Sequence, residues 1–191
     1  MRTASSSSID TSSPPAHSTS TDLALIASFA ALIGVLGIVP PIMVGLPVPI
    51  TLQTMGVMLA GLILGARRGA LAVLVFLALV AVGLPLLSGG RGGLGVFAGP
   101  SAGYLVGFVL GAYVTGWVME RLANRVHLVA AALTAAVVGG IAAVYLFGIP
   151  VLVWRTGADP LASLVFLPGD LLKAALATAV AVGVRRALPQ R

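Results

Sequence analysis

Residues 126–147 have the sequence VHLVAAALTAAVVGGIAAVYLF, which contains no Asp, Glu, Lys or Arg. A run of this kind is close to the ~20 apolar residues that an α-helix needs to cross a bilayer. The same character extends along the chain: 59% of its 191 residues are hydrophobic and 8% are charged. Soluble domains carry about 25% charged residues, so the sequence predicts an integral membrane protein.

Turn signals and charges divide the chain into six apolar segments. The segment quoted above is expected to end at Gly148-Ile149-Pro150. Residues 1–21 are rich in Ser and Thr and have few apolar side chains, so they are expected to form a disordered tail. Residues 22–187 are expected to form one membrane domain with an all-α fold, a bundle of six short transmembrane helices. These helices are predicted at residues 23–39, 50–64, 69–82, 101–119, 126–147 and 161–184.

The basic residues gather in the loops on one side of the predicted bundle. The loops on the other side hold only Arg91 and Arg155. Because cytoplasmic loops are enriched in Lys and Arg, both termini are predicted to be cytoplasmic, and the loop that carries Arg91 faces outwards. The residues assigned to the cytoplasmic side are Arg2, Arg67, Arg68, Arg121, Arg125, Arg185, Arg186 and Arg191.

Membrane topology does not explain three charged residues, Arg91, Asp170 and Lys173. Asp170 and Lys173 fall in the outer half of the last segment, and positions i and i+3 share one face of a helix. Each such group costs about 2.5–3.5 kcal/mol at a helix centre and normally faces a bundle interior or an aqueous cavity. The pair either neutralises itself and locks the helix in place, or belongs to a binding site. Arg91 lies among the glycines of residues 89–95, which allow the backbone to approach a ligand closely.

Several classes of function are disfavoured by what the sequence lacks. No phosphate-binding GxxxxGK[ST] loop occurs, so an ATP-driven step must come from another polypeptide. The chain has no cysteine, and His17 and His127 are too isolated to indicate a metal centre. An intramembrane enzyme could use Asp170 as an acid or base, but no second membrane aspartate and no Ser–His or Cys nucleophile accompanies it. We therefore expect neither an enzyme nor a resident cofactor.

The first segment carries small residues at helical spacing, notably Ala27 and Ala31. Small-xxx-small patterns allow transmembrane helices to pack closely. This face either packs inside the bundle or is reserved for another membrane protein.

Three motifs resemble those of a known family. They are VPITLQT at residues 48–54, GGRGGLG at 89–95 with GPSAGYL at 99–105, and LPGDLLK at 167–173. The chain is similar, over roughly residues 23–187, to BioY, the biotin-specific substrate-binding subunit of energy-coupling-factor (ECF) transporters. The resemblance implies a plasma-membrane protein with a vitamin site near its outer surface. It also implies two kinds of partner: a transmembrane coupling protein, which contacts Ala27 and Ala31, and two ABC-type ATPases. ATP would act only through these ATPases.

The chemistry of biotin suits the residues that the motifs place. The carboxylate of Asp170 can accept hydrogen bonds from the two ureido N–H groups. Lys173 or Arg91 could pair with the carboxylate of the biotin tail, and a planar guanidinium favours Arg91. Gln53 and Tyr104 are expected to add polar contacts, and Leu52, Phe97 and Tyr104 to line the apolar part. The alternative is the same architecture with another small vitamin or organic anion as ligand.

Overall fold

The structure is a computed structural model that describes residues 19–43 and 45–187. Within them the chain is helical, apart from connecting loops and two isolated β-bridges, which confirms the predicted all-α bundle. Residues 1–18, most of the predicted tail, lie outside the described residues, as do Arg2 and Arg191. The six helices are α1 (Thr19–Leu36), α2 (Gln53–Leu64), α3 (Ala66–Ala81), α4 (Ala102–Leu122), a long helix from Leu128 to Thr156, and α7 (Leu167–Ala187).

Four helical stretches of the described residues are long and apolar enough to cross a membrane. These are α1, α4, the long helix, and α7 together with the 3-10 helix η3 (Pro160–Phe166) that precedes it. α2 has 12 residues and α3 has 16, so both fall short of the ~20 residues of a full span. This agrees with the predicted short second and third segments.

Several helix boundaries differ from the prediction by three residues or more. α1 begins at Thr19, so residues 19–21 are helical and do not belong to the tail; Asp22 in the first turn interacts favourably with the helix dipole. α3 begins at Ala66, because the carboxylate of Glu120 accepts a hydrogen bond from the Ala66 N–H at 2.9 Å. α7 begins only at Leu167, because the residues before it form η3.

The prediction that the fifth helix ends near Pro150 is wrong. This helix runs from Leu128 to Thr156 as α5 (Leu128–Ala135), a π-helical segment η2 (Ala136–Ala143) and α6 (Val144–Thr156), with Pro150 inside α6. Ending the helix within the lipid would expose several unpaired backbone groups, whereas a proline inside it removes only one hydrogen bond. The helix therefore continues through Pro150. The helix ends at Gly157, whose left-handed backbone (φ 68°) suits glycine, and whose N–H donates to the Val153 carbonyl.

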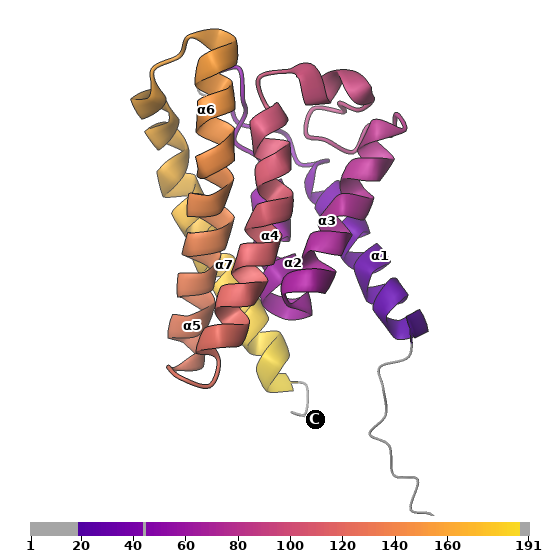
Figure 1. The fold of residues 1–191 in the computed structure, drawn as a ribbon, viewed down its shortest axis with the longest axis vertical. Coiled ribbons are helices and arrows are strands. Elements are labelled where there is room, and N and C mark those ends of the chain that lie inside the picture. Colours follow the sequence, from indigo (N-terminus) through magenta and orange to yellow (C-terminus); the bar gives the residue numbers. More distant parts are fainter. Residues whose placement is uncertain (1–18, 44, 188–191) are drawn as a thin grey trace, which may run out of the picture.

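Helix α4 packs against α2, α3 and the long helix and occupies the middle of the bundle (Figure 1). Glycines at every fourth position make its contact with the long helix possible. A Cβ atom at Gly103 would overlap the Phe147 carbonyl, and one at Gly107 would lie 2.8 Å from the Val144 carbonyl. The close fit of backbone on backbone makes these two helices a rigid wall.

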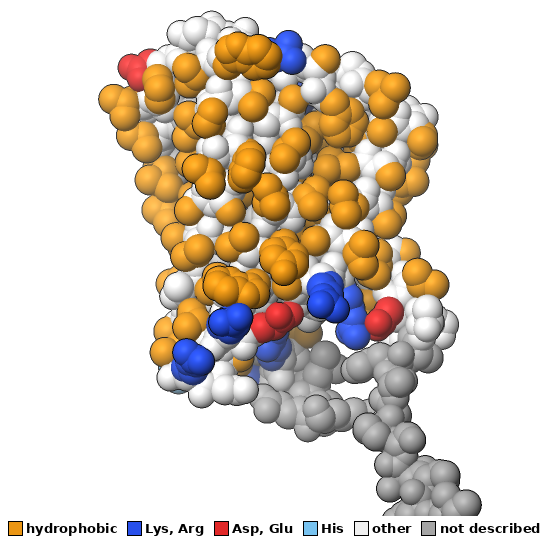
Figure 2. Space-filling model, viewed as in Figure 1, with side chains coloured by type: hydrophobic (Ala, Val, Ile, Leu, Met, Phe, Trp, Pro, Cys, Tyr) orange, Lys and Arg blue, Asp and Glu red, His pale blue; other side chains and the backbone are white. Residues whose placement is uncertain are grey.

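Most basic residues of the described chain gather at one end of the bundle, as predicted; the exceptions are Arg91, Arg155 and Lys173. Figure 2 shows the gathered residues below a broad apolar surface, at the end where α1 begins and α7 ends in Figure 1. Two side chains secure the α2–α3 corner there. Arg185 donates from Nε and Nη2 to the Leu62 carbonyl at 3.2 and 2.8 Å, and Glu120 holds the start of α3. The positive-inside rule assigns this end to the cytoplasm.

Candidate ligand-binding site

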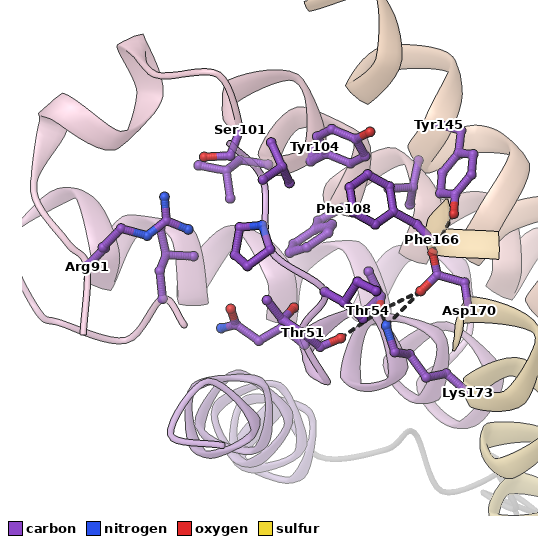
Figure 3. Close-up of a pocket in the computed structure, with 17 residues that line it drawn as sticks. Thr51, Thr54, Arg91, Ser101, Tyr104, Phe108, Tyr145, Phe166, Asp170 and Lys173 are labelled. Carbon is purple, nitrogen blue, oxygen red and sulfur yellow. Dashed lines mark hydrogen bonds and ion pairs between the residues drawn. The ribbon is translucent and has the colours of Figure 1, made fainter. Parts of the chain in front are cut away.

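A cavity lies inside the opposite end of the bundle, where α2, α4 and α7 begin (Figure 3). Its wall is completed by residues 48–51, by the loop that carries Arg91 and by the middle of the long helix. The cavity is narrow, with about 60 Å³ of interior open to water-sized molecules. Its lining residues are Val48, Pro49, Ile50, Thr51, Gln53, Thr54, Leu87, Arg91, Ser101, Tyr104, Leu105, Phe108, Val144, Tyr145, Phe166, Asp170 and Lys173.

The predicted pair Asp170 and Lys173 forms one pole of this cavity. The first two turns of α7 place both side chains on its inner face, where Lys173 Nζ lies 2.7 Å from Asp170 Oδ1. The two side chains are only 6–7% exposed. The ion pair therefore compensates two charges that would otherwise be costly in the bundle. Because it also lines the cavity, locking α7 and facing a ligand are compatible roles.

Two further side chains fix the orientation of the Asp170 carboxylate. The hydroxyl of Tyr145, on the long helix, donates to Asp170 Oδ2 at 2.7 Å. The hydroxyl of Thr54, on α2, lies 3.4 Å from Asp170 Oδ1 and accepts from Lys173 Nζ at 3.2 Å. Three helices thus meet at one carboxylate, and its three hydrogen bonds leave about one of its four acceptor sites, on Oδ2, unused.

Arg91 forms the opposite pole (Figure 3). Its loop is drawn together by paired backbone hydrogen bonds between Leu87 and Arg91 at 3.0 and 3.2 Å. The turn between them needs left-handed backbone at Gly89 and Gly90 (φ 79° and 68°), which glycine adopts without steric cost. Arg91 Nε donates to the Ser88 carbonyl at 3.2 Å. Within the described part of the chain, no carboxylate forms an ion pair with this guanidinium.

Gln53 lines the cavity, but its amide is engaged in fastening the Arg91 loop. Nε2 donates to the Leu86 carbonyl at 3.0 Å and to the Ile33 carbonyl at 3.3 Å, while Oε1 accepts from the Ser88 N–H at 3.1 Å. Gln53 is 2% exposed, so both amide hydrogens are satisfied within the protein. The Gln53 amide thus contacts the loop that carries Arg91, while its contact with a ligand stays a prediction.

An aromatic wall separates the two poles. The ring of Tyr104 meets Tyr145 and Phe166 edge to face, with centroids 6.5 and 6.3 Å apart, and Phe108 lies beside them (Figure 3). The Tyr104 hydroxyl is buried and has no hydrogen-bond partner among the described residues. The Ser163 side chain lies beside it.

The expected apolar contacts of Leu52 and Phe97 are wrong. Neither residue lines the cavity. Phe97 belongs to the short 3-10 helix η1 (Leu94–Ala98) and packs against the outside of the core. Phe108 and Phe166 take this role because they lie on the inner faces of helix α4 and of the η3–α7 junction.

Sequence reasoning missed Thr54 and Tyr145. A signal existed for each: Thr54 ends the VPITLQT motif, and Tyr145 is one of only three tyrosines in the chain, placed in an otherwise apolar segment. Their link to Asp170 spans 116 and 25 positions of sequence, however, and only the packing of three helices reveals it.

The helical membrane bundle holds a cavity between its helices that is charged at two poles and aromatic between them. These features define a membrane protein that binds a small molecule. Comparisons with known proteins agree. The sequence model of the BioY family matches residues 6–190, and the chain belongs to the BioY family. It is 54% identical over 166 residues to a biotin transporter BioY of Rhizobium etli, covering 82% of this chain and 88% of that protein. It is 48% identical to a biotin transporter BioY of Rhodobacter capsulatus, over 84% of this chain and 90% of that protein.

A solved structure has the same fold. The crystal structure of the S-component for biotin from an ECF-type ABC transporter matches with a TM-score of 0.84 and 33% identity, covering 91% of this chain and 95% of that one. The chain is therefore a multi-pass membrane protein of a transporter family.

Proposed function

We propose that this chain is the substrate-binding subunit of a biotin uptake transporter, which captures external biotin in the cavity described above. The observation that carries the proposal is the cavity's division into two charged poles with an aromatic wall between them. Biotin has the matching division: a ureido group at one end, a carboxylate on a flexible tail at the other, and an apolar bicycle between. The names of the relatives and of the similar solved structure support the same ligand.

The distribution of charge favours one orientation of biotin. The Asp170 carboxylate is acceptor-only and is oriented by Tyr145 and Thr54, and its remaining acceptor site suits a ureido N–H donor. Lys173 lies against Asp170 and can donate to the ureido oxygen at the same pole. Arg91 is left for the tail carboxylate, which a guanidinium can bind through two parallel hydrogen bonds.

Binding requires the cavity to widen. Its interior of about 60 Å³ is well below the roughly 300 Å³ at which small-molecule sites begin. The long helix and α4 pack backbone against backbone. The Arg91 loop is held instead by its own hydrogen bonds, by Gln53, by the buried Leu87 side chain and by one backbone bond from Gly93 to Val80 at 2.7 Å. We therefore expect the loop to move when biotin binds.

Transport needs a partner that supplies energy. The proposed partners are a transmembrane coupling protein and two ABC-type ATPases of an ECF module, and the chain itself is proposed to be neither an enzyme nor a cofactor carrier. Ala27 and Ala31 are exposed on α1, which argues against packing inside the bundle and supports their use as the contact with the coupling protein.

The test is a biotin titration of the full chain purified in detergent, with the Arg91→Gln variant and with Arg155→Gln as the matched control. Arg155 lies at the same end of the bundle but does not line the cavity. A lost charge-assisted pair of about 1.5–3 kcal/mol predicts roughly 10- to 150-fold weaker binding for Arg91→Gln and no change for the control. Absence of biotin binding to the unaltered chain would favour another vitamin or organic anion.

A further inference from the structure

A second hollow lies at the basic end of the bundle, between the start of α3 and the last three turns of α4. Its volume is about 570 Å³. It lies at the lower edge of the apolar surface, where basic side chains replace apolar ones (Figure 2). We call it the α3–α4 groove, and it is lined by Leu64, Ala66, Arg67, Arg68, Tyr113, Trp117, Glu120 and Arg121.

The α3–α4 groove has excess positive charge. Three arginines and one glutamate line it, giving a formal charge of +3 − 1 = +2. Arg68 is engaged by Asp22, with Nη2 3.2 Å from Oδ1, and Glu120 accepts from the Ala66 N–H. Neither Arg67, at the start of α3, nor Arg121, at the end of α4, forms an ion pair within residues 19–43 and 45–187. Two cations from different helices therefore border one hollow.

An aromatic face leads from the apolar surface into this groove. Tyr113, Trp117 and Arg121 follow one another at four-residue intervals, so they lie along one face of α4. Tyr113 and Trp117 are 44% and 43% exposed, and the Arg121 guanidinium lies 4.9 Å from the centre of the Trp117 ring. Tyrosine and tryptophan concentrate at the membrane–water interface. The groove thus offers an apolar path that ends at two cations.

We propose that the α3–α4 groove binds an anionic phospholipid of the cytoplasmic leaflet. The headgroup phosphate lies between Arg67 and Arg121, and an acyl chain lies along Trp117 and Tyr113. Basic pockets between transmembrane helices on the cytoplasmic side are suited to anionic headgroups. The positive-inside rule accounts for arginines at this end, but it does not require two helices to present them across one hollow beside exposed aromatic rings. A free phosphate would use the arginines and leave the aromatic face unused.

The chain offers a matched control. Arg125 and Arg186 are exposed at the same end of the bundle but do not line the groove. The double variants Arg67→Gln/Arg121→Gln and Arg125→Gln/Arg186→Gln therefore lose equal charge at the same membrane face. Thermal unfolding of both variants in detergent checks that each is folded.

The measurement is native mass spectrometry of the full chain titrated with phosphatidylglycerol or with phosphatidylcholine. We expect the unaltered chain to retain phosphatidylglycerol selectively. Loss of both groove arginines should weaken this binding by roughly 25-fold, at about fivefold for each arginine near an anionic lipid, while the control changes by less than threefold. Equal losses in the two double variants, or equal retention of the two lipids, would overturn the proposal. Displacement of phosphatidylglycerol by inorganic phosphate at millimolar concentration would identify a phosphate site instead.

Discussion

The buried pair Asp170–Lys173 is expected to serve both stability and biotin binding, and a mutant cycle separates the two roles. Lys173→Met leaves the Asp170 carboxylate buried without its cation. Removing one partner of a buried pair costs about 3–5 kcal/mol, which corresponds to a fall of roughly 6–20 °C in the thermal midpoint of a chain of this size. Asp170→Asn leaves the Lys173 ammonium unpaired at 5% exposure, and we expect a loss of similar size.

The double variant Asp170→Asn/Lys173→Met contains no buried charge at this pole. The amide of Asn can still accept a hydrogen bond from Tyr145, so most of the lost thermal stability should return. Biotin binding should not return, because the ureido N–H groups no longer meet a carboxylate. The loss of charge-assisted hydrogen bonds of about 1.5–3 kcal/mol predicts roughly 10- to 150-fold weaker binding.

Two assays on detergent-purified protein decide the matter: the thermal midpoint, and the Kd for biotin by calorimetric titration. The control is Asp22→Asn, which breaks the half-exposed ion pair with Arg68 and should cost less than about 1 kcal/mol. A double variant that regains stability and also binds biotin within threefold of the unaltered chain would refute the reasoning, since the pair would then only lock α7 in place.

Two further predictions concern positioning and coupling. Gln53→Leu should lower biotin affinity by releasing the Arg91 loop, because it leaves three buried backbone groups unpaired at about 1–3 kcal/mol each. The same substitution added to Arg91→Gln should lower the affinity no further. An additive loss of affinity in titrations of the double variant would instead make Gln53 a direct ligand contact. Ala27→Trp or Ala31→Trp should abolish biotin uptake by cells that contain the transport partners. The Kd of the purified chain for biotin should stay unchanged, because both residues are exposed. Loss of biotin binding by the purified variants would contradict a role in coupling.

The bundle and its orientation could be predicted from sequence because the underlying physics is local. Apolar runs indicate the membrane helices, and the positions of four arginines indicate the cytoplasmic end of the bundle: Arg67, Arg68, Arg121 and Arg125. Neither inference requires knowing how the helices pack against one another. The same argument isolated Asp170 and Lys173, since charges that topology does not explain need a cavity or a partner. The structure supplies both for this pair.

What could not be predicted depends on contacts between distant segments. The fifth helix continues past Pro150 because a broken helix costs more in lipid than one missing hydrogen bond. In water-soluble proteins a proline usually indicates the end of a helix, so the sequence pattern predicted an end here. Gln53 lies in a motif that suggests ligand contact, yet its amide meets Leu86, Ile33 and Ser88. No spacing along the chain indicates which partner a buried amide will find.

The arrangement of these contacts indicates how the two poles of the cavity differ. Asp170 is held by side chains from three helices, and the close packing of Gly103 and Gly107 of α4 against the long helix leaves that wall little freedom. Arg91 stands on a loop that is attached to the helices by Gln53, by the buried Leu87 and by one backbone hydrogen bond from Gly93 to Val80. A ligand that meets both poles therefore meets a fixed carboxylate and a movable guanidinium, so contact with Arg91 closes the loop over a ligand already placed by Asp170. This order requires that loss of Arg91 speed biotin dissociation more than it slows association.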